Sequence, residues 1–535
     1  MRAIFLLSLA ATMLFSLDRF EELEKRPQGR TRDFASSIFL KSSTKVDPSR
    51  TIFYTMRSPK PKAVGNFAAI VKSRSLNALL ACKQAAISSA TSAECLAIAL
   101  TVSQAENLDK PLLEALSTKV AAIDPNKSAW LSALAKANPL EAAARDPSTF
   151  FTIALGASES FWQKQPALKI GVEALQDDRR FSRVVQRLAV LNIPRENSRF
   201  LLAADAKKLD HKGAFYLAIL QLQNDRFFAA SAAFAISETK ADTQYAKDRA
   251  AFWQWLTSTD KKAVDRLLSS HDINIYSLLA HEIYENKLPV FHTTAEAPKG
   301  AKAVYKEKQL FDPYFAESLS RKIHAGDHKI LKAELAKLAH QDAQAYRAAI
   351  LYALEPHKPP NFYLSPYQKP LEKLSADDRA IALAIMRQES RYIPSALSTS
   401  YAIGSMQMMP FLIEDMTKER KAFKGHETIW SFFSPYIELP YAIRHIAWLK
   451  SKLDHPLYIF YAYNAGQGFT RRLLDSRRLF QTGKYEPFLS MELVPVEETR
   501  EYGKLVLSNY VIYKMLENDP ITLDSLLRTL TKQND

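Results

Sequence analysis

Glycine and cysteine are scarce in this chain. Only 13 of its 535 residues are glycine and two are cysteine, and long segments contain neither glycine nor proline. Such segments favour helices, and a chain of this length is too long for one compact core. The composition therefore predicts an all-α protein of two or three domains.

The two cysteines are Cys82 and Cys95, which flank a predicted turn between two apolar runs. Two helices folding back at this turn would bring the sulfurs together, and an exported protein would allow a disulfide there. In a reducing compartment they would be two buried thiols. Without suitably spaced histidines they do not make a zinc site, and we expect neither a metal nor a cofactor.

Long hydrophobic runs are also missing. The longest is Ala3–Phe15, preceded by Arg2, and it is too short for the roughly 20 residues of a membrane-spanning helix. This pattern is typical of a secretory signal peptide, and it predicts a signal peptide at residues 1–17, cut near Ser16. The alternative is an uncleaved amphipathic start in a cytosolic protein.

Charge is unevenly distributed. The net charge is +15, yet residues 371–535 contribute only +1, so the first 370 residues carry +14. A basic surface attracts polyanions such as nucleic acid, anionic lipid or acidic cell-wall polymer. A solvated basic face without a specific partner is the alternative interpretation.

Helical periodicity divides the chain into successive regions. Residues 18–300 predict an α-superhelix of helical hairpins, although residues from about Phe20 to Pro61 are polar with few periodic stretches. The clearest helical pair runs from Lys212 to Ile236. Residues 301–370 predict a helical linker domain, and residues 371–535 a catalytic domain. Short breaks in the superhelix are expected at Pro111, Pro125, Pro139, Pro166 and Pro194.

One helix of the last region carries a carboxyl group in line with apolar residues. Ser375 is a good N-cap, and Pro394 stops the helix. Ile381, Ile385 and Glu389 fall on one face of it. Burial there would raise the pKa of Glu389 by roughly 1–3 units, and the helix dipole acts in the same direction. A raised pKa suits a general acid, whereas an isolated glutamate at a helix end is more often a surface charge.

Two further motifs follow this helix. Gly404, Met406, Gln407 and Pro410 lie in a loop and at the start of a helix, and a Tyr-Asn-Ala-Gly run occupies residues 463–466. Six of the 13 glycines lie after residue 400. A helical domain that uses so little glycine needs it there for backbone shape.

Together these segments resemble the catalytic domain of the soluble lytic transglycosylases, a lysozyme-like family. The similarity runs from about Ala380 to Met515 with the motifs in the family's order. RQES at residues 387–390 resembles the family's glutamate-serine signature, and residues 404–410 its G-L-M-Q-x-x-P pattern. Its E-x-I-P-x-x-E-T-R pattern is matched by Glu492, Pro495, Glu498, Thr499 and Arg500, with Tyr502 following.

The resemblance implies a lysozyme-like, mostly helical catalytic domain that cleaves the MurNAc-β-1,4-GlcNAc bond of peptidoglycan and leaves 1,6-anhydromuramic acid ends. It places Glu389 as sole general acid and base. Glu492 and Arg500 are expected either to form a structural ion pair or to touch the peptide stem. The residues expected to bind the substrate are Ser390, Ser398, Met406, Gln407, Tyr463, Asn464, Ala465 and Glu492.

The sequence departs from the family pattern at three positions. Tyr401 stands where the family has glycine, Ser405 where it has leucine, and Glu438 where it has asparagine. Tyr401 is expected to reshape the groove near the acid. Glu438 is expected to solvate a helix end, or else to add a carboxylate near the site.

Other functions remain open at this stage. A hydrolytic lysozyme-like muramidase would need a second carboxylate, such as Glu438 or Asp454, to position water. A non-catalytic peptidoglycan-binding scaffold and a nucleic-acid-binding helical repeat are the remaining alternatives, and the export signal argues against nucleic acid. We expect a periplasmic monomer that acts on glycan strands, with cell-wall synthesis or secretion machinery as further partners.

Overall fold

The computed structural model describes residues 26–42, 82, 87–419 and 428–531, so the predicted signal peptide lies outside the described residues. Within the described part, the only strands are the two-residue segments β1 (Phe291–His292) and β2 (Asn361–Phe362), and every other regular element is a helix. The all-α prediction is confirmed. None of the described helices combines the length and apolar character that crossing a bilayer requires.

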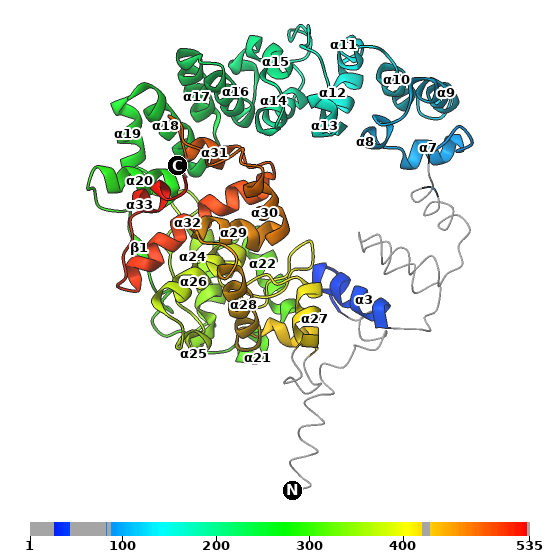
Figure 1. Ribbon diagram of the computed structural model, residues 1–535. Coiled ribbons are helices and arrows are strands. Elements are labelled where there is room, and N and C mark those ends of the chain that lie inside the picture. The colour runs from blue at the N-terminus through cyan, green and yellow to red at the C-terminus, as the bar shows by residue number, and fades with distance from the viewer. Residues whose placement is uncertain (1–25, 43–81, 83–86, 420–427, 532–535) are drawn as a thin grey trace.

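The first large region is an arc of helices in which each element packs mainly on its neighbours in sequence (Figure 1). The pair expected from Lys212 to Ile236 is α16 and α17. In chain order the elements of the arc are α7 (Ala93–Ala99), α8 (Val102–Ala105), α9 (Lys110–Val120), α10 (Pro125–Leu134), α11 (Pro139–Ala143), α12 (Pro147–Gly156), α13 (Glu159–Gln163), α14 (Arg180–Val190), α15 (Arg195–Ser198), η1 (Arg199–Ala203), η2 (Ala206–Lys208), α16 (His211–Gln223), α17 (Phe227–Lys240), α18 (Gln244–Ser258), α19 (Lys261–Leu268) and α20 (Ile275–Ile283).

Prolines in the arc mark helix starts and connections. Pro125 opens α10, where the side chain of Asp124 accepts a hydrogen bond from the backbone of Lys127. Asp146 caps α12 in the same way. Proline suits these first turns because its missing N–H would have no partner there, and the carboxylate caps supply acceptors for the free N–H groups. The expected breaks therefore coincide with helix starts, some of them capped by a side chain, or with coil.

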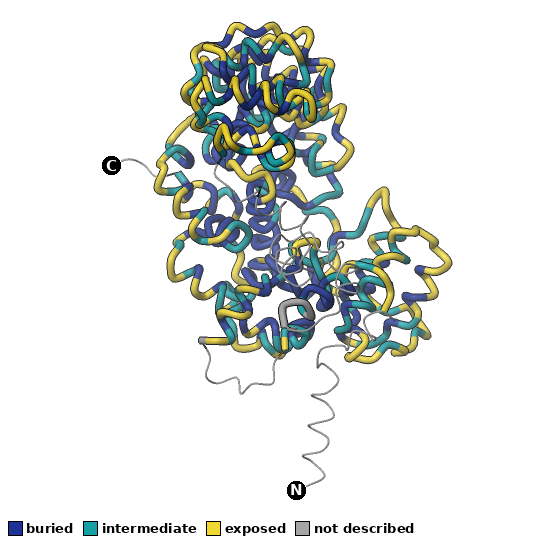
Figure 2. Tube along the Cα trace, turned by 90° about the vertical axis from the view of Figure 1, so that its right-hand side faces the viewer, coloured by how far each residue is buried: buried dark blue, intermediate teal, exposed yellow. Residues whose placement is uncertain are grey.

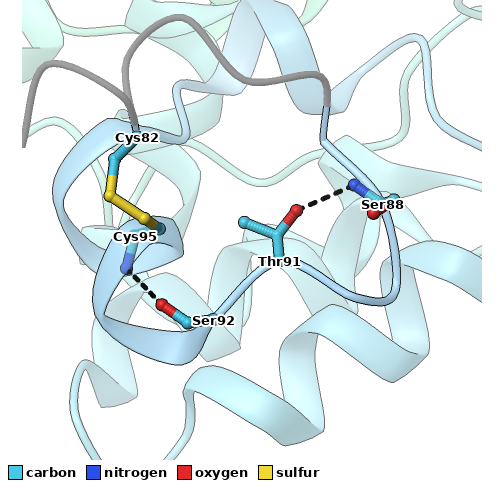
Figure 3. The surroundings of a disulfide bond; sticks show 5 residues. All are labelled: Cys82, Ser88, Thr91, Ser92 and Cys95. Atoms are coloured by element: carbon cyan, nitrogen blue, oxygen red, sulfur yellow. Dashed lines mark hydrogen bonds between the residues drawn. A yellow bond between two sulfur atoms is a disulfide. The ribbon is translucent and has the colours of Figure 1, made fainter. Parts of the chain in front are cut away.

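A disulfide joins Cys82 and Cys95 near the beginning of the arc, with the two Cα atoms 5.0 Å apart (Figure 3). Cys95 lies in α7, and its backbone N–H donates to the N-cap Ser92. Thr91 accepts a hydrogen bond from the backbone N–H of Ser88 in the preceding turn. The disulfide, one of the two possibilities left by the sequence, is therefore formed.

A second group of helices has a small hydrophobic core of its own, with Leu310, Leu331 and Tyr346 among its buried residues. Strands β1 and β2, on either side of this group, pair in parallel with Phe291 opposite Asn361. The pairing ties together the two segments that connect the group to its neighbours. Its helices are α21 (Glu307–Leu310), α22 (Pro313–Ala325), α23 (His328–Leu335), η3 (Gln341–Ala343) and α24 (Gln344–Leu354).

Helix α3 (Arg30–Ser42) packs away from the arc, against α22 and the last region of the chain (Figure 1). Phe34 is buried and makes edge contacts with Tyr401 and Trp430. The Arg30 guanidinium donates to the carbonyl of Leu397 at 2.7 Å. Residues 20–61 are polar and weakly periodic, so the sequence does not predict this helix. One buried aromatic residue anchors it, and a single residue leaves no periodic apolar pattern.

The last region is built around α26 (Ala376–Ser390), which is buried from Ala380 to Met386 and packs against α28 and α32. Figure 2 shows buried residues concentrated in the centre of this region. A helix that is apolar on all sides belongs in a core. The other helices of the region are α25 (Gln368–Leu371), α27 (Pro410–Glu419), η4 (Ile429–Phe433), α28 (Pro435–Lys450), α29 (Pro456–Ala465), α30 (Gln467–Asp475), α31 (Phe488–Glu492), α32 (Glu497–Leu516) and α33 (Leu523–Arg528).

Candidate active site

Glu389 lies in the last turn of α26, on the side that faces α32. Its side chain is half-buried, and the hydroxyl of Tyr502 on α32 donates to Glu389 Oε1 at 2.7 Å. The predicted N-cap is present, since Ser375 accepts a hydrogen bond from the backbone of Asp378. The helix ends at Ser390, and Arg391 takes the left-handed conformation (φ 51°). The acid is thus fixed at the end of a rigid, buried helix.

Burial raises the pKa of Glu389 to about 7, because the surrounding protein replaces the water that would stabilise the carboxylate. The hydrogen bond from Tyr502 acts in the opposite direction by stabilising the ionised form, and the negative charge of Glu498 adds a smaller upward shift. A carboxyl group with this pKa is protonated in part of the molecules near neutral pH. It can donate a proton and take one back.

The loop that follows α26 is held beside the acid through its carbonyl groups. Ser390 Oγ donates to the carbonyl of Ser405, and the hydroxyl of Tyr463 donates to the carbonyl of Met406, each at 2.8 Å. Gly404 has a φ of +82°, and a Cβ atom there would collide with the carboxyl group of Glu438. The glycine singled out in the sequence is therefore required both for its backbone conformation and for the close approach of Glu438.

Three of the predicted substrate-binding residues bond within the protein at this loop. Met406 is fully buried. The amide of Gln407 donates to the carbonyls of Gly404 at 2.8 Å and Ala396 at 3.3 Å. Ser398 Oγ accepts the backbone N–H of Ala402 at 2.8 Å. These contacts give the residues a role in shaping the loop, while their contact with a sugar stays a prediction.

The Tyr-Asn-Ala-Gly run ends α29 next to the acid, and Gly466 (φ +87°) ends the helix. Asn464 accepts a hydrogen bond from Thr499 at 2.7 Å and donates to Glu498 at 3.4 Å. Tyr463, Asn464 and Ala465 are all half-buried. Ser390, Ser398 and Gln407 are half-buried as well, so these six predicted binding residues keep part of their surface exposed.

Glu492 lies instead in a buried network of charges. It is only 1% exposed and forms ion pairs with Arg249 of α18 and with Lys504, the latter at 2.7 Å. Tyr276 of α20 donates to the same carboxylate at 2.6 Å. The two cations hold the pKa of Glu492 well below its usual range. Of the two roles expected for Glu492, this position favours the structural one.

The expected ion pair between Glu492 and Arg500 is not what the structure has. Arg500 is buried, donates to the carbonyl of Val494 at 2.6 Å, and lies 3.6 Å from the carboxylate of Glu501. The network joins the arc of helices to the last region, since Arg249 and Tyr276 come from the arc. Through Lys504 it also contacts α32, the helix that carries Tyr502.

Sequence reasoning did not assign Tyr502 or Glu498 to the site. Both act directly on the electrostatics of Glu389, and both lie on α32, four residues apart. This spacing places two residues on the same face of a helix. The signal was present in the sequence, because Glu498 belongs to a recognised motif and Tyr502 follows it.

Two departures from the family pattern make specific contacts. Tyr401 has a positive φ (66°), a conformation that favours glycine, and its ring lies 5.4 Å from that of Phe34 on α3. Glu438, expected at a solvated helix end, is instead completely buried. It lies in the first turn of α28 and accepts hydrogen bonds from the backbone of Ser405 and Met406. The expectation of solvation was wrong because the helix start faces the loop rather than water.

No group of three or more histidine, cysteine, aspartate or glutamate residues that could hold a metal ion occurs in the described ranges. The polar groups around Glu389 are the hydroxyls of Ser390 and Tyr502, the amide of Asn464 and the carboxylate of Glu498. Such a set can exchange protons with a substrate and orient polar sugar groups.

Comparison with known proteins finds a family model that matches the part of the chain containing Glu389. Residues 367–485 match the family model of the transglycosylase SLT domain. A stretch of 148 residues is 28% identical to the soluble lytic murein transglycosylase of Escherichia coli K12, and it covers 28% of this chain and 22% of that protein. The aligned part therefore spans about a fifth of the relative's length.

Solved structures show similarity over a longer part of the chain. The 70 kDa soluble lytic transglycosylase of Escherichia coli has a TM-score of 0.47 and 15% identity, covering 96% of this chain and 79% of that one. An inactive mutant of lytic transglycosylase Slt from Pseudomonas aeruginosa has a TM-score of 0.44 and 15% identity, covering 92% and 79%. The similarity to the transglycosylase SLT domain family rests on the matched family model, which covers residues 367–485 of this chain.

Proposed function

We propose that this protein is a peptidoglycan lytic transglycosylase in which Glu389 is the sole general acid and base. The observation that carries the proposal is a half-buried carboxyl group with a pKa of about 7 inside a transglycosylase SLT domain. The substrate is the glycan strand of peptidoglycan, and the bond cut is the MurNAc-β-1,4-GlcNAc linkage.

In the first stage the protonated Glu389 gives its proton to the oxygen that links the two sugars. The bond between that oxygen and C1 of the muramoyl sugar breaks, and the neighbouring sugar leaves as an alcohol. The carbonyl oxygen of the muramoyl N-acetyl group bonds to C1 and compensates the developing positive charge. The hydrogen bond from Tyr502 supports this step, because it stabilises the carboxylate that forms on Glu389.

In the second stage the ionised Glu389 removes the proton of the C6 hydroxyl of the same sugar. The C6 oxygen then attacks C1 and displaces the acetamido oxygen, which leaves a 1,6-anhydro sugar and a reprotonated Glu389. No water is consumed. A pKa near 7 suits both stages, because donating and recovering a proton are then comparably favourable at neutral pH.

The hydrolytic alternative needs a second carboxylate able to hold an attacking water. Glu438 does not suit this role, because it is fully buried and its two oxygens accept hydrogen bonds from Ser405 and Met406. Asp454 is exposed before the start of α29. It lies two residues before α29 begins, and the helix from Pro456 to Tyr463 alone spans about 10 Å at 1.5 Å per residue. Both positions favour the lytic reaction.

The deciding experiment digests purified sacculi with wild type and with the Glu389→Gln variant and identifies the released glycans by mass spectrometry. We expect anhydro products from wild type, lighter than reducing-end products by one water, and none from the variant. Reducing-end products from wild type would establish a muramidase. Full activity in Glu389→Gln would refute the acid, and binding to sacculi without any cleavage by wild type would favour a scaffold.

We further propose that the protein acts in the periplasm as a monomer, with cell-wall synthesis or secretion machinery as possible partners. The disulfide between Cys82 and Cys95 supports export, because disulfides persist in oxidising compartments. The predicted signal peptide supports it as well, although it lies outside the described residues. Salt-dependent binding to duplex DNA would favour the nucleic-acid alternative instead.

A further inference from the structure

Two of the positions at which this sequence departs from the family pattern are in direct contact. Ser405 Oγ donates to Glu438 Oε2 at 2.7 Å, although 33 residues separate them along the chain. Both side chains are fully buried. We propose that Glu438 and Ser405 form a clamp that positions the active-site loop, residues 404–407, and that Glu438 is a positioning residue for the proposed reaction. The inference rests on the proposed function.

The carboxyl group of Glu438 also binds the backbone of the loop. The N–H of Ser405 donates to Oε2 and the N–H of Met406 donates to Oε1, each at 2.8 Å. With the Ser405 hydroxyl, three donors from two consecutive residues converge on one carboxyl group. Three such bonds fix both the position and the orientation of the peptide between Ser405 and Met406.

The opposite side of the same peptide segment is bound by residues beside the acid. The carbonyl of Ser405 accepts from Ser390, the residue after Glu389, and the carbonyl of Met406 accepts from Tyr463. The segment is therefore suspended between Glu438 on one side and the catalytic neighbourhood on the other. A shift of the loop away from Glu438 would move the hydrogen-bond partners of Ser390 and Tyr463.

The chemistry of the pair explains why the two departures occur together. An asparagine at position 438 would be one methylene shorter and would offer only one acceptor oxygen to the two N–H groups. A leucine at position 405 would place an apolar side chain against a buried carboxyl group, which is costly. Gly404 completes the arrangement, since any Cβ there would collide with Glu438.

The test compares Glu438→Gln, Ser405→Ala and the double variant by kcat, KM and melting temperature. Glutamine keeps the shape of the side chain but turns an NH2 group toward one backbone N–H. We expect Glu438→Gln to lose about 10- to 100-fold in kcat/KM, because small misplacements near a catalytic group carry losses of this size. Ser405→Ala should lose less, and the double variant no more than Glu438→Gln alone. A Ser405→Leu/Glu438→Asn variant should recover activity relative to Glu438→Asn alone.

Glu486→Gln is the matched control. Glu486 is a half-buried glutamate that also accepts the backbone N–H of a serine, Ser490, at 3.2 Å, and burial raises its pKa. It should keep the kcat and KM of wild type.

Unchanged kcat and KM in Glu438→Gln at a temperature well below its melting point would overturn the positioning role, as would losses in the two single variants that simply multiply. Failure of the proposed function is distinguishable, because wild type itself would then release no anhydro product. In that case the melting temperatures test the clamp. The decrease in the double variant must then differ from the sum of the decreases in Glu438→Gln and Ser405→Ala.

Discussion

Replacing Glu389 by glutamine should stabilise the protein at alkaline pH and leave its stability nearly unchanged in acid. The pKa of Glu389 is raised from 4.5 to about 7 in the folded protein. A raised carboxyl pKa means that the folded state binds the proton more tightly than the unfolded state. The stabilisation that this tighter proton binding gives the folded state is complete below pH 4.5 and is lost as the pH rises through 7. Glutamine cannot ionise and loses nothing.

The size of the effect follows from the shift. At 1.36 kcal/mol for each pKa unit, the ionised Glu389 costs at most about 3 kcal/mol in the folded state. The side chain is half-buried, so water screens part of this energy, and we expect about 1–2 kcal/mol. For a domain of 150–250 residues, each kcal/mol changes the melting temperature by roughly 2–4 °C. The variant should therefore melt about 2–8 °C above wild type at pH 9.

The measurement is the melting temperature of both proteins, by scanning calorimetry, at intervals from pH 4 to pH 9. Glu438, whose pKa burial raises to about 8, ionises in both proteins, so its direct contribution largely cancels in the difference. We expect the two curves to coincide near pH 4 and to separate between pH 5 and pH 8. Parallel curves over the whole range would show that Glu389 is not desolvated, and the argument for its role as an acid would fail.

Three further outcomes follow from the same structure. The Tyr502→Phe variant loses the hydrogen bond that stabilises the ionised Glu389. We expect wild-type kcat/KM to fall above about pH 7, and the variant to move this fall to higher pH with about a tenfold lower maximum, which a pH–rate profile checks. Arg249→Met removes one of two cations from the buried Glu492 and should destabilise the protein by about 3–5 kcal/mol, measured by urea unfolding; a loss under 1 kcal/mol would contradict the network's role. Replacing Cys82 and Cys95 by alanine should cost about 3 kcal/mol, as for a loop of some 15 residues, and leave kcat unchanged; a changed kcat would show coupling to the distant site.

The features that sequence could predict are those set by local periodicity and capping. Glu389 was placed at the end of a buried helix because apolar residues recur every four positions before it, and α26 has that form. The helix starts at Pro125 and Pro139 follow from proline in a first turn. These arguments need only residues a few positions apart, and they succeed where the structure is regular.

No comparable periodicity predicts the direction of side chains in an irregular loop. The sequence predicts that Met406 and Gln407 bind the sugar, but it does not predict that Met406 is buried or that the Gln407 amide bonds to the loop itself. A loop lacks the fixed repeat that assigns alternate or fourth residues to one face. The motif therefore identified which residues matter, while the hydrogen bonds that hold the loop had to come from the structure.

Contacts between distant parts of the chain are the hardest to predict from sequence, and here such contacts influence the pKa of Glu389. The sequence predicts for Glu492 either an ion pair with Arg500 or contact with substrate, whereas its partner Arg249 comes from the arc, 243 residues earlier. The same network includes Lys504 of α32, the helix that carries Tyr502. The hydrogen bond from Tyr502 lowers the pKa of Glu389, against the larger upward effect of burial. The arc of helices is therefore linked, through this buried network, to the helix from which that hydrogen bond is donated.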